Sequence, residues 1–233
     1  IMSTNERILS PFTLPNGTEL KNRLLMAPMT TCTGYYDGTV TSELVEYYRA
    51  RAGSIGTIIV ECCFVDDLGL AFPGAIGIDN DEKIAGLAKI ADAIKSKGSK
   101  ALLQIYHGGR MVDPKLIGGR TPVGPSAVAA PRDGAATPVA LTSEEVEGMI
   151  GKFGEAVRRA IQAGFDGVEI HGANTYLIQQ FYSPNSNQRD DEWGGSRDNR
   201  AKFPLAVLDI THKMVRQYAD DAFIIGYRFS PEE

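Results

Sequence analysis

The stretch His171-Gly-Ala-Asn174-Thr-Tyr176 carries more information about fold and function than any other part of this sequence. It follows the apolar run from Phe165 to Ile170, which predicts a strand buried on both faces of a parallel sheet. Three polar side chains therefore gather where a strand ends and a loop begins. In α/β barrels the reactive groups lie at that end of the strands. Two hydrogen-bond donors and a nearby phenol suit a carbonyl that must be polarised and a carbon that must be protonated.

Strand-like and helix-like segments alternate along the rest of the chain. The expected strands are residues 24–29, 56–62, 101–106, 165–170 and 222–228, and three of the expected helices are residues 42–53, 81–98 and 198–218. Another helix begins at the capping box Thr142-x-x-Glu145 and ends at Gly164. Such alternation predicts βαβ units with right-handed crossovers and a parallel sheet. Neither a GxGxxG motif after the first strand nor a GxxxxGK[ST] motif is present, which disfavours Rossmann and P-loop folds.

The predicted fold is therefore α/β, a TIM (β/α)8 barrel of which about the first five β/α units are present. A closed barrel needs eight units and typically ~250 residues, whereas this sequence ends at Glu233, soon after the fifth strand. We expect residues 1–233 to form a single incomplete barrel domain that lacks its C-terminal units. Such a domain has open sheet edges, which predicts that the 233-residue chain by itself is poorly soluble or catalytically weak.

Composition excludes several classes of function. The net charge of −5 argues against nucleic acid or an anionic membrane as a general partner, and no apolar run approaches the length of a transmembrane helix. The first ten residues contain no apolar segment typical of a secretory signal. Cys32, Cys62 and Cys63 form neither a disulfide framework nor a metal-binding CxxC motif. We expect a cytoplasmic protein without a structural metal.

At this point the motifs of the chain resemble those of a known family, the Old Yellow Enzymes, which are FMN-dependent NAD(P)H:flavin oxidoreductases and ene reductases. The resemblance extends from about Leu9 to Pro231. Its elements occur in the family's order, and they are Asn22-Arg-Leu-Leu-Met-Ala-Pro28-Met29-Thr30, Glu43-x-x-Glu46-Tyr47-Tyr48-x-x-Arg51, Gln104-x-x-His107-x-Gly109-Arg110, Pro122-x-x-Pro125-Ser126, His171-x-x-Asn174-x-Tyr176, Ser183-Pro-x-x-Asn187-x-Arg189-x-Asp191-Glu-Trp-Gly-Gly-Ser196 and Arg228-x-Ser230.

The resemblance implies that FMN lies across the C-terminal mouth of the barrel. The cofactor-binding residues that it implies are Ala27, Pro28, Met29, Thr30, Cys62, Gln104, His171 and Arg228. Thr30 would bond the flavin O4 region, Gln104 the pyrimidine edge, and Arg228 would lie near N1. The family's phosphate-binding residues follow the last barrel strands.

The catalytic residues implied by the resemblance are His171, Asn174 and Tyr176. Hydride would pass from NADH or NADPH through flavin N5 to the β carbon of an α,β-unsaturated carbonyl. His171 and Asn174 would bond the carbonyl oxygen of this small-molecule substrate, and Tyr176 would protonate the α carbon. The resemblance leaves a homo-oligomer possible.

Alternatives remain for the whole chain and for single residues. The chain could be the N-terminal barrel of an iron–sulfur flavoenzyme such as the dienoyl-CoA reductases, or a truncated product without flavin or activity. Arg228 could pair with a carboxylate instead of a flavin. An unpaired Gln104 amide on an apolar strand would be costly, so we expect a ligand as its partner. His107, Arg110 and the polar segment 187–200 have structural roles in this interpretation.

Overall fold

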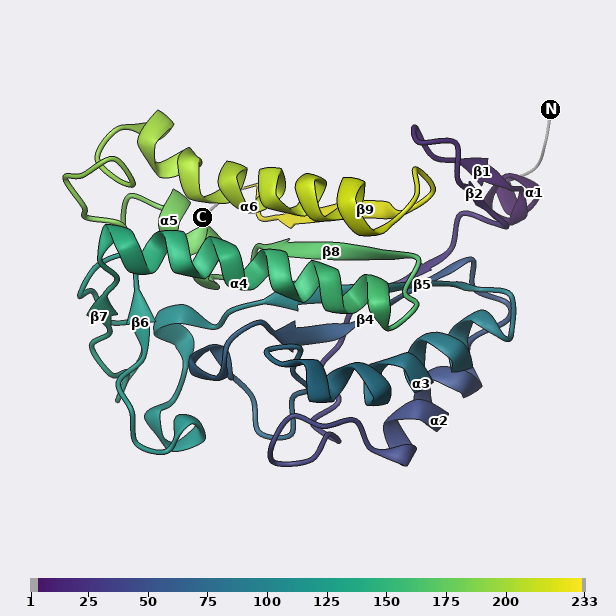
Figure 1. Ribbon diagram of the computed structural model, residues 1–233, viewed down its shortest axis with the longest axis horizontal. Coiled ribbons are helices and arrows are strands. Elements are labelled where there is room, and N and C mark those ends of the chain that lie inside the picture. Colours follow the sequence, from purple (N-terminus) through teal and green to yellow (C-terminus); the bar gives the residue numbers. More distant parts are fainter. Residues whose placement is uncertain (1–3, 232–233) are drawn as a thin grey trace.

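A curved sheet of five parallel strands forms the centre of the computed structural model, which describes residues 4–231 (Figure 1). The strand order is β3-β4-β5-β8-β9, and every neighbouring pair is parallel. The strands are β3 (Leu25–Met26), β4 (Thr57–Phe64), β5 (Lys100–Tyr106), β8 (Gly167–Gly172) and β9 (Ile224–Phe229). The five predicted strands are confirmed, although the first pairs over only two residues.

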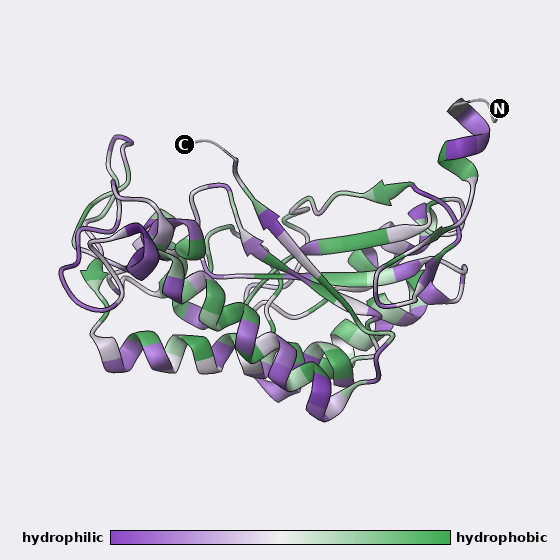
Figure 2. Ribbon diagram, turned by 90° about the horizontal axis from the view of Figure 1, so that it is seen from above, coloured by the Kyte–Doolittle hydropathy of each residue, from purple (hydrophilic) through white to green (hydrophobic). Residues whose placement is uncertain are grey.

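Four longer helices cover one face of this sheet, as Figure 2 shows from above. They are α2 (Ser42–Arg51), α3 (Ile84–Lys95), α4 (Ser143–Gln162) and α6 (Arg197–Tyr218). Their apolar sides and the outward side chains of the strands form the main core. The capping box at α4 is confirmed: Thr142 Oγ1 accepts from the Glu145 N–H, and the Glu145 carboxylate accepts from the Thr142 N–H.

Several short elements were not predicted. They are α1 (Thr4–Leu9), β1 (Phe12–Thr13), β2 (Glu19–Leu20), β6 (Val123–Gly124), β7 (Val139–Ala140), α5 (Leu177–Tyr182) and 3₁₀ turns at Asp67–Gly69, Asp81–Lys83, Gly109–Met111 and Pro114–Ile117. The second predicted helix was wrong at both ends, since residues 81–83 are a 3₁₀ turn and α3 stops at Lys95. Periods of 3.6 and 2 cannot identify elements as short as these.

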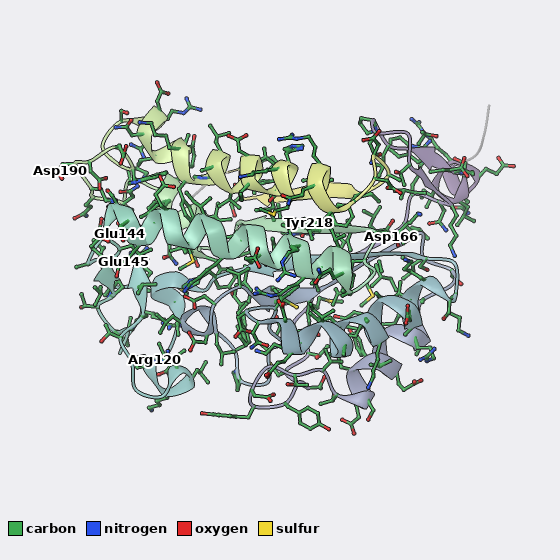
Figure 3. The ribbon with its side chains drawn as sticks, viewed as in Figure 1. Arg120, Glu144, Glu145, Asp166, Asp190 and Tyr218 are labelled. Atoms are coloured by element: carbon green, nitrogen blue, oxygen red, sulfur yellow. The ribbon has the colours of Figure 1, made fainter. Side chains whose placement is uncertain are left out.

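Because the five strands of this half-barrel are parallel, their amino ends lie at one end of it and their carboxyl ends at the other. Figure 3 labels Glu145 at the start of α4 and Asp166 just before β8, at opposite ends of the molecule, so β8 runs back toward the start of α4. The hairpin β1–β2 lies at the amino ends of the strands (Figure 1), where Asn16 Nδ2 and Thr18 Oγ1 donate to backbone carbonyls of residues 221–223. The carboxyl ends are left for the loops that follow the strands.

Side chains on the inner face of the sheet form layers that follow the strand register. At the amino end, Ile59, Leu102 and Ile224 pack under the hairpin residue Leu20. Strand β4 changes phase above this layer, because its pairing with β5 shifts between Val60 and Cys63. Such a bulge re-aims the side chains beyond it.

The upper inner layers are polar. Gln104 is level with Glu169, and His171 is level with Arg228 in the register of neighbouring strands. Residues 4–231 contain no helix long and apolar enough to cross a bilayer, and no cluster of potential metal ligands.

Candidate active site

A cavity of about 300 Å³ opens at the carboxyl ends of the strands. It is lined by Pro28, Thr30, Cys62, Phe72, Gln104, His171, Asn174, Tyr176 and Arg228. All the predicted site residues except Ala27 and Met29 thus meet in one place, although they come from five strands or the loops after them. Ala27 and Met29 do not line the cavity, and Met29 is 53% exposed. Phe72, from the loop after β4, was not predicted.

His171 is a neutral hydrogen-bond donor at the floor of the cavity. Burial, with a smaller contribution from the nearby Arg228 charge, lowers the pKa of this imidazole to about 4. Its Nδ1 accepts from the Ala173 N–H at 3.4 Å. That bond assigns the ring proton to Nε2, because a neutral imidazole carries one donor and one acceptor.

Asn174 is held in a left-handed backbone conformation at the rim. Its φ is 55° and that of Thr175 is 67°, both in a region that residues other than glycine rarely adopt. Three hydrogen bonds brace this turn: the Asn174 N–H to Ser230 Oγ, the Thr175 N–H to Gln179 Oε1, and Gln180 Nε2 to the Thr175 carbonyl. Backbone strain of this kind costs roughly 1–3 kcal/mol and clusters at functional sites.

Tyr176 presents a protonated phenol to the same cavity. Its ring contacts three others edge-on, with centroid distances of 5.0 Å to His171, 5.4 Å to Tyr106 and 6.2 Å to Phe72. Burial, and to a lesser extent Cys62, raises the pKa of Tyr176 to about 12. The hydroxyl therefore keeps its proton at neutral pH and can donate it.

Glu169, which binds two of the lining residues, is another residue that the sequence interpretation missed. This carboxylate is 7% exposed, and Gln104 Nε2 donates to its Oε1 at 2.7 Å. Arg228 binds it through two further hydrogen bonds, at 2.7 Å from Nε to Oε1 and 3.2 Å from Nη2 to Oε2. The Gln104 amide therefore has a protein partner where we expected a ligand, and Arg228 pairs with a carboxylate as the alternative for this residue predicted. The period-two spacing of Glu169 and His171 on one strand was the available signal.

The wall formed by Thr30 and Cys62 is weakly polar. Thr30 Oγ1 lies 3.4 Å from Cys62 Sγ, and burial raises the pKa of this thiol to about 12. Cys62 therefore remains a protonated thiol, and both it and Cys63 are buried. Cys32 is exposed and does not line the cavity.

The donor set fits the ring system of a flavin. A flavin pyrimidine edge presents both acceptors and a donor, and N1 gains negative charge on reduction. Gln104 retains an amide oxygen, Thr30 offers a hydroxyl, and Arg228 supplies a permanent positive charge. Pro28 and Cys62 add apolar wall to the same cavity.

Comparison with known proteins assigns the chain to a family. The model of the NADH:flavin oxidoreductase / NADH oxidase family matches residues 7–233. The chain belongs to this family. Membership implies FMN as the cofactor, in agreement with the sequence prediction. The chain is 89% identical over 232 residues to an NADH:fumarate oxidoreductase of Klebsiella pneumoniae (strain 342), and 59% identical over 227 residues to an NADH:acrylate oxidoreductase of Vibrio harveyi.

Solved structures of this flavin oxidoreductase family have the same fold. Morphinone reductase in complex with tetrahydroNAD is 33% identical, with a TM-score of 0.87 over 96% of this chain and 64% of its own. A complex of 2-naphthoyl-CoA reductase is 31% identical, with a TM-score of 0.89 over 96% of this chain and 35% of its own. The half-barrel is thus confirmed. The chain spans only 25% and 23% of the fumarate and acrylate oxidoreductases.

Proposed function

We propose that this chain forms the catalytic mouth of an NADH-dependent flavin oxidoreductase that reduces a carbon–carbon double bond conjugated to an uncharged carbonyl. Bound FMN would supply the hydride chemistry, taking a hydride from NADH and giving it to the β carbon of the alkene. The observation that carries the proposal is the meeting of His171, Asn174 and Tyr176 in one cavity with Gln104 and Arg228.

His171 and Asn174 would stabilise the carbonyl oxygen as negative charge develops on it. The imidazole donates from Nε2, and the strained turn at Asn174 holds the amide beside it. Donors fixed in advance stabilise the transition state more than the ground state, and the loss of one costs roughly 10²–10³ in rate.

Tyr176 would complete the reduction by protonating the α carbon. Its pKa of about 12 keeps the proton on the hydroxyl until it is needed. A general acid in this position contributes roughly 10²–10⁴ in rate.

The charges of the site favour a neutral carbonyl over a carboxylate. His171 is uncharged at neutral pH, and the only cation that lines the described cavity, Arg228, is paired with Glu169. A carboxylate next to these donors would find no unpaired cation among the residues that line the cavity, which is costly in a desolvated site. A ketone, an aldehyde, a thioester or the carboxamide of nicotinamide meets no such penalty.

A second candidate is NADH oxidation with onward transfer of the electrons to another part of a longer protein. It is favoured by length, because the fumarate and acrylate oxidoreductases are about four times as long as the part that matches this chain. Fumarate and acrylate are carboxylates, the class that the charges of this cavity disfavour. In this alternative, His171 and Asn174 would hold the nicotinamide carboxamide, and Tyr176 would donate no proton.

The test uses the FMN-loaded full-length protein with NADH and either cyclohexenone or ferricyanide as the electron acceptor. If the first candidate is correct, Tyr176→Phe loses about 10²–10⁴-fold in turnover with cyclohexenone and nothing with ferricyanide. Turnover with ferricyanide but not with cyclohexenone in the wild type would establish the second candidate. An FMN-loaded protein that oxidises NADH with neither acceptor would refute both.

A further inference from the structure

A second hollow of about 450 Å³ continues from the catalytic cavity past Asn174. Asn174 lines both, and the second hollow extends along the loop after β8 to residues 110–111 and 130–132. Its remaining lining is mostly hydroxyl and amide side chains, and these are Thr175, Gln179, Gln180, Ser183, Asn185, Ser186 and Ser230. A ligand whose reactive end contacts Asn174 therefore has a polar channel beside it for the rest of its length.

The charges that line this hollow are all positive. Arg110 and Arg132 are lining residues, and no Asp or Glu is among them. The chain as a whole carries a net charge of −5, so a polar hollow with two arginines and no carboxylate departs from the overall composition. Asp133 follows Arg132 in sequence but does not line the hollow.

Arg132 is the cation best placed to meet a ligand there. Its side chain is exposed, its Nη2 donates to the Met111 carbonyl at 2.8 Å, and it forms no ion pair with any residue between 4 and 231. The backbone bond orients the guanidinium and leaves its other N–H groups for a ligand. The positive charge of Arg132 also lowers the pKa of Tyr176 slightly, which places it within electrostatic reach of the catalytic cavity.

We propose that this hollow is an anion subsite, in which Arg132 binds the phosphate-bearing tail of a compound whose carbonyl group is held by His171 and Asn174. The inference rests on the proposed function, because that function supplies the carbonyl end. Arginine recognises phosphate oxygens through two parallel N–H donors. The dinucleotide reductant and a coenzyme A thioester both have a carbonyl at one end and phosphates further along.

The first experiment measures binding without turnover. Tetrahydro-NAD, which cannot give a hydride, is titrated into the FMN-loaded full-length protein by calorimetry. We expect Arg132→Gln to weaken its binding about tenfold, the usual size for one charge-assisted contact, and added salt to weaken wild-type binding more than variant binding. Arg120→Gln is the matched control: Arg120 is also exposed, but it lies on a different hollow and pairs with Asp67 at 2.8 Å.

The second experiment separates the two sources of phosphate. NADH is compared with 1-benzyl-1,4-dihydronicotinamide, which has the carboxamide but no phosphate, and a coenzyme A enoyl thioester is compared with cyclohexenone. If the reductant uses the subsite, Arg132→Gln raises the KM for NADH and leaves that for the benzyl compound unchanged. If the acyl substrate uses it, only the KM of the thioester rises.

The inference is overturned if Arg132→Gln changes neither the affinity for tetrahydro-NAD nor the KM of either phosphate-bearing compound. It is also overturned if Arg120→Gln has the same effect as Arg132→Gln, since the effect would then be one of net charge. Failure of the proposed function has a different signature, because the wild-type protein would then not reduce cyclohexenone with either NADH or the benzyl compound.

Discussion

Two buried glutamates, Glu61 on β4 and Glu169 on β8, have opposite electrostatic surroundings. Glu61 is fully buried, and its carboxylate accepts from the Tyr48 hydroxyl at 3.1 Å and from the Thr31 N–H at 3.4 Å. Among residues 4–231 no cation forms an ion pair with it. Glu169 is bound by the guanidinium of Arg228 and the amide of Gln104. Burial raises the pKa of Glu61 above its usual value. Two carboxylates buried in the same sheet therefore differ in their bonded partners, since one faces a guanidinium and the other faces neutral donors.

The two residues also serve the cavity differently. Glu169 holds two side chains that line it, Gln104 and Arg228. Glu61 braces the backbone at Thr31, next to the lining residue Thr30, from the side of the sheet where Tyr48 of α2 packs. One glutamate orients side chains inside the cavity, and the other supports its wall from behind.

The largest expected effect is that of Glu169→Ala. This change leaves Arg228 without a counter-charge and Gln104 without its acceptor. We expect a loss of about 2–3 kcal/mol in the free energy of unfolding. The loss is smaller than for a fully buried ion pair because Arg228 is partly exposed. FMN should bind about tenfold more weakly, because two side chains of its site are no longer oriented. Denaturant unfolding and flavin fluorescence titration measure the two effects. Unchanged FMN affinity would show that the ion pair is only structural.

Tyr48→Phe tests the surroundings of Glu61 with a smaller change. The Tyr48 hydroxyl donates to the Glu61 carboxylate and accepts from the Glu61 N–H at 2.9 Å, so its removal leaves two buried polar groups without this partner. We expect a loss of about 1–3 kcal/mol in unfolding free energy. FMN affinity should change less than in Glu169→Ala. An equal change would show that the two glutamates do not serve the cavity in different ways.

Glu61→Gln sharpens the comparison through pH. Below pH 4.5 the carboxyl is protonated in both states, and above it the unfolded chain releases the proton first because the folded pKa is raised. Wild-type stability should therefore fall relative to that of the variant as the pH rises above 4.5, by up to ~1.4 kcal/mol per pH unit until the folded pKa is passed. Unfolding curves at several pH values measure this difference. If the stability difference between wild type and variant stays constant with pH, or grows in favour of the wild type, then folding does not raise the pKa of Glu61.

The smallest expected effect is in the pH dependence of turnover. Because the pKa of His171 is lowered to about 4, the imidazole stays neutral through the range in which an exposed histidine would become charged. The rate of enone reduction should therefore not fall as the pH drops through about 6.5 because of this residue. Any fall near that pH should also be present in His171→Gln. A descending acid limb near that pH, present only in the wild type, would mean that the imidazole is charged in the working enzyme.

Much of this architecture could be predicted because it depends on local patterns. The five strands, the cap at Thr142 and the grouping of His171, Asn174 and Tyr176 follow from strand composition, capping chemistry and the position of a loop. Glu169 as the partner of Arg228 depends on the register between β8 and β9, and the left-handed turn at Asn174 depends on bonds from α5 and the loop after β9. No pattern within one segment encodes such relations.

The bulge in β4 decides which side of the sheet each residue beyond it faces. Ile58, Val60 and Cys63 belong to the outer core, whereas Ile59 and Cys62 face the inner side, so one additional residue separates the two alternating sets. A strand of the same length without the bulge would alternate regularly from Ile59, and would turn Glu61 to the inner side and Cys62 to the outer side. A carboxylate would then lie on the wall that Thr30 shares with the cavity. The irregular pairing of β4 therefore keeps a negative charge out of the cavity.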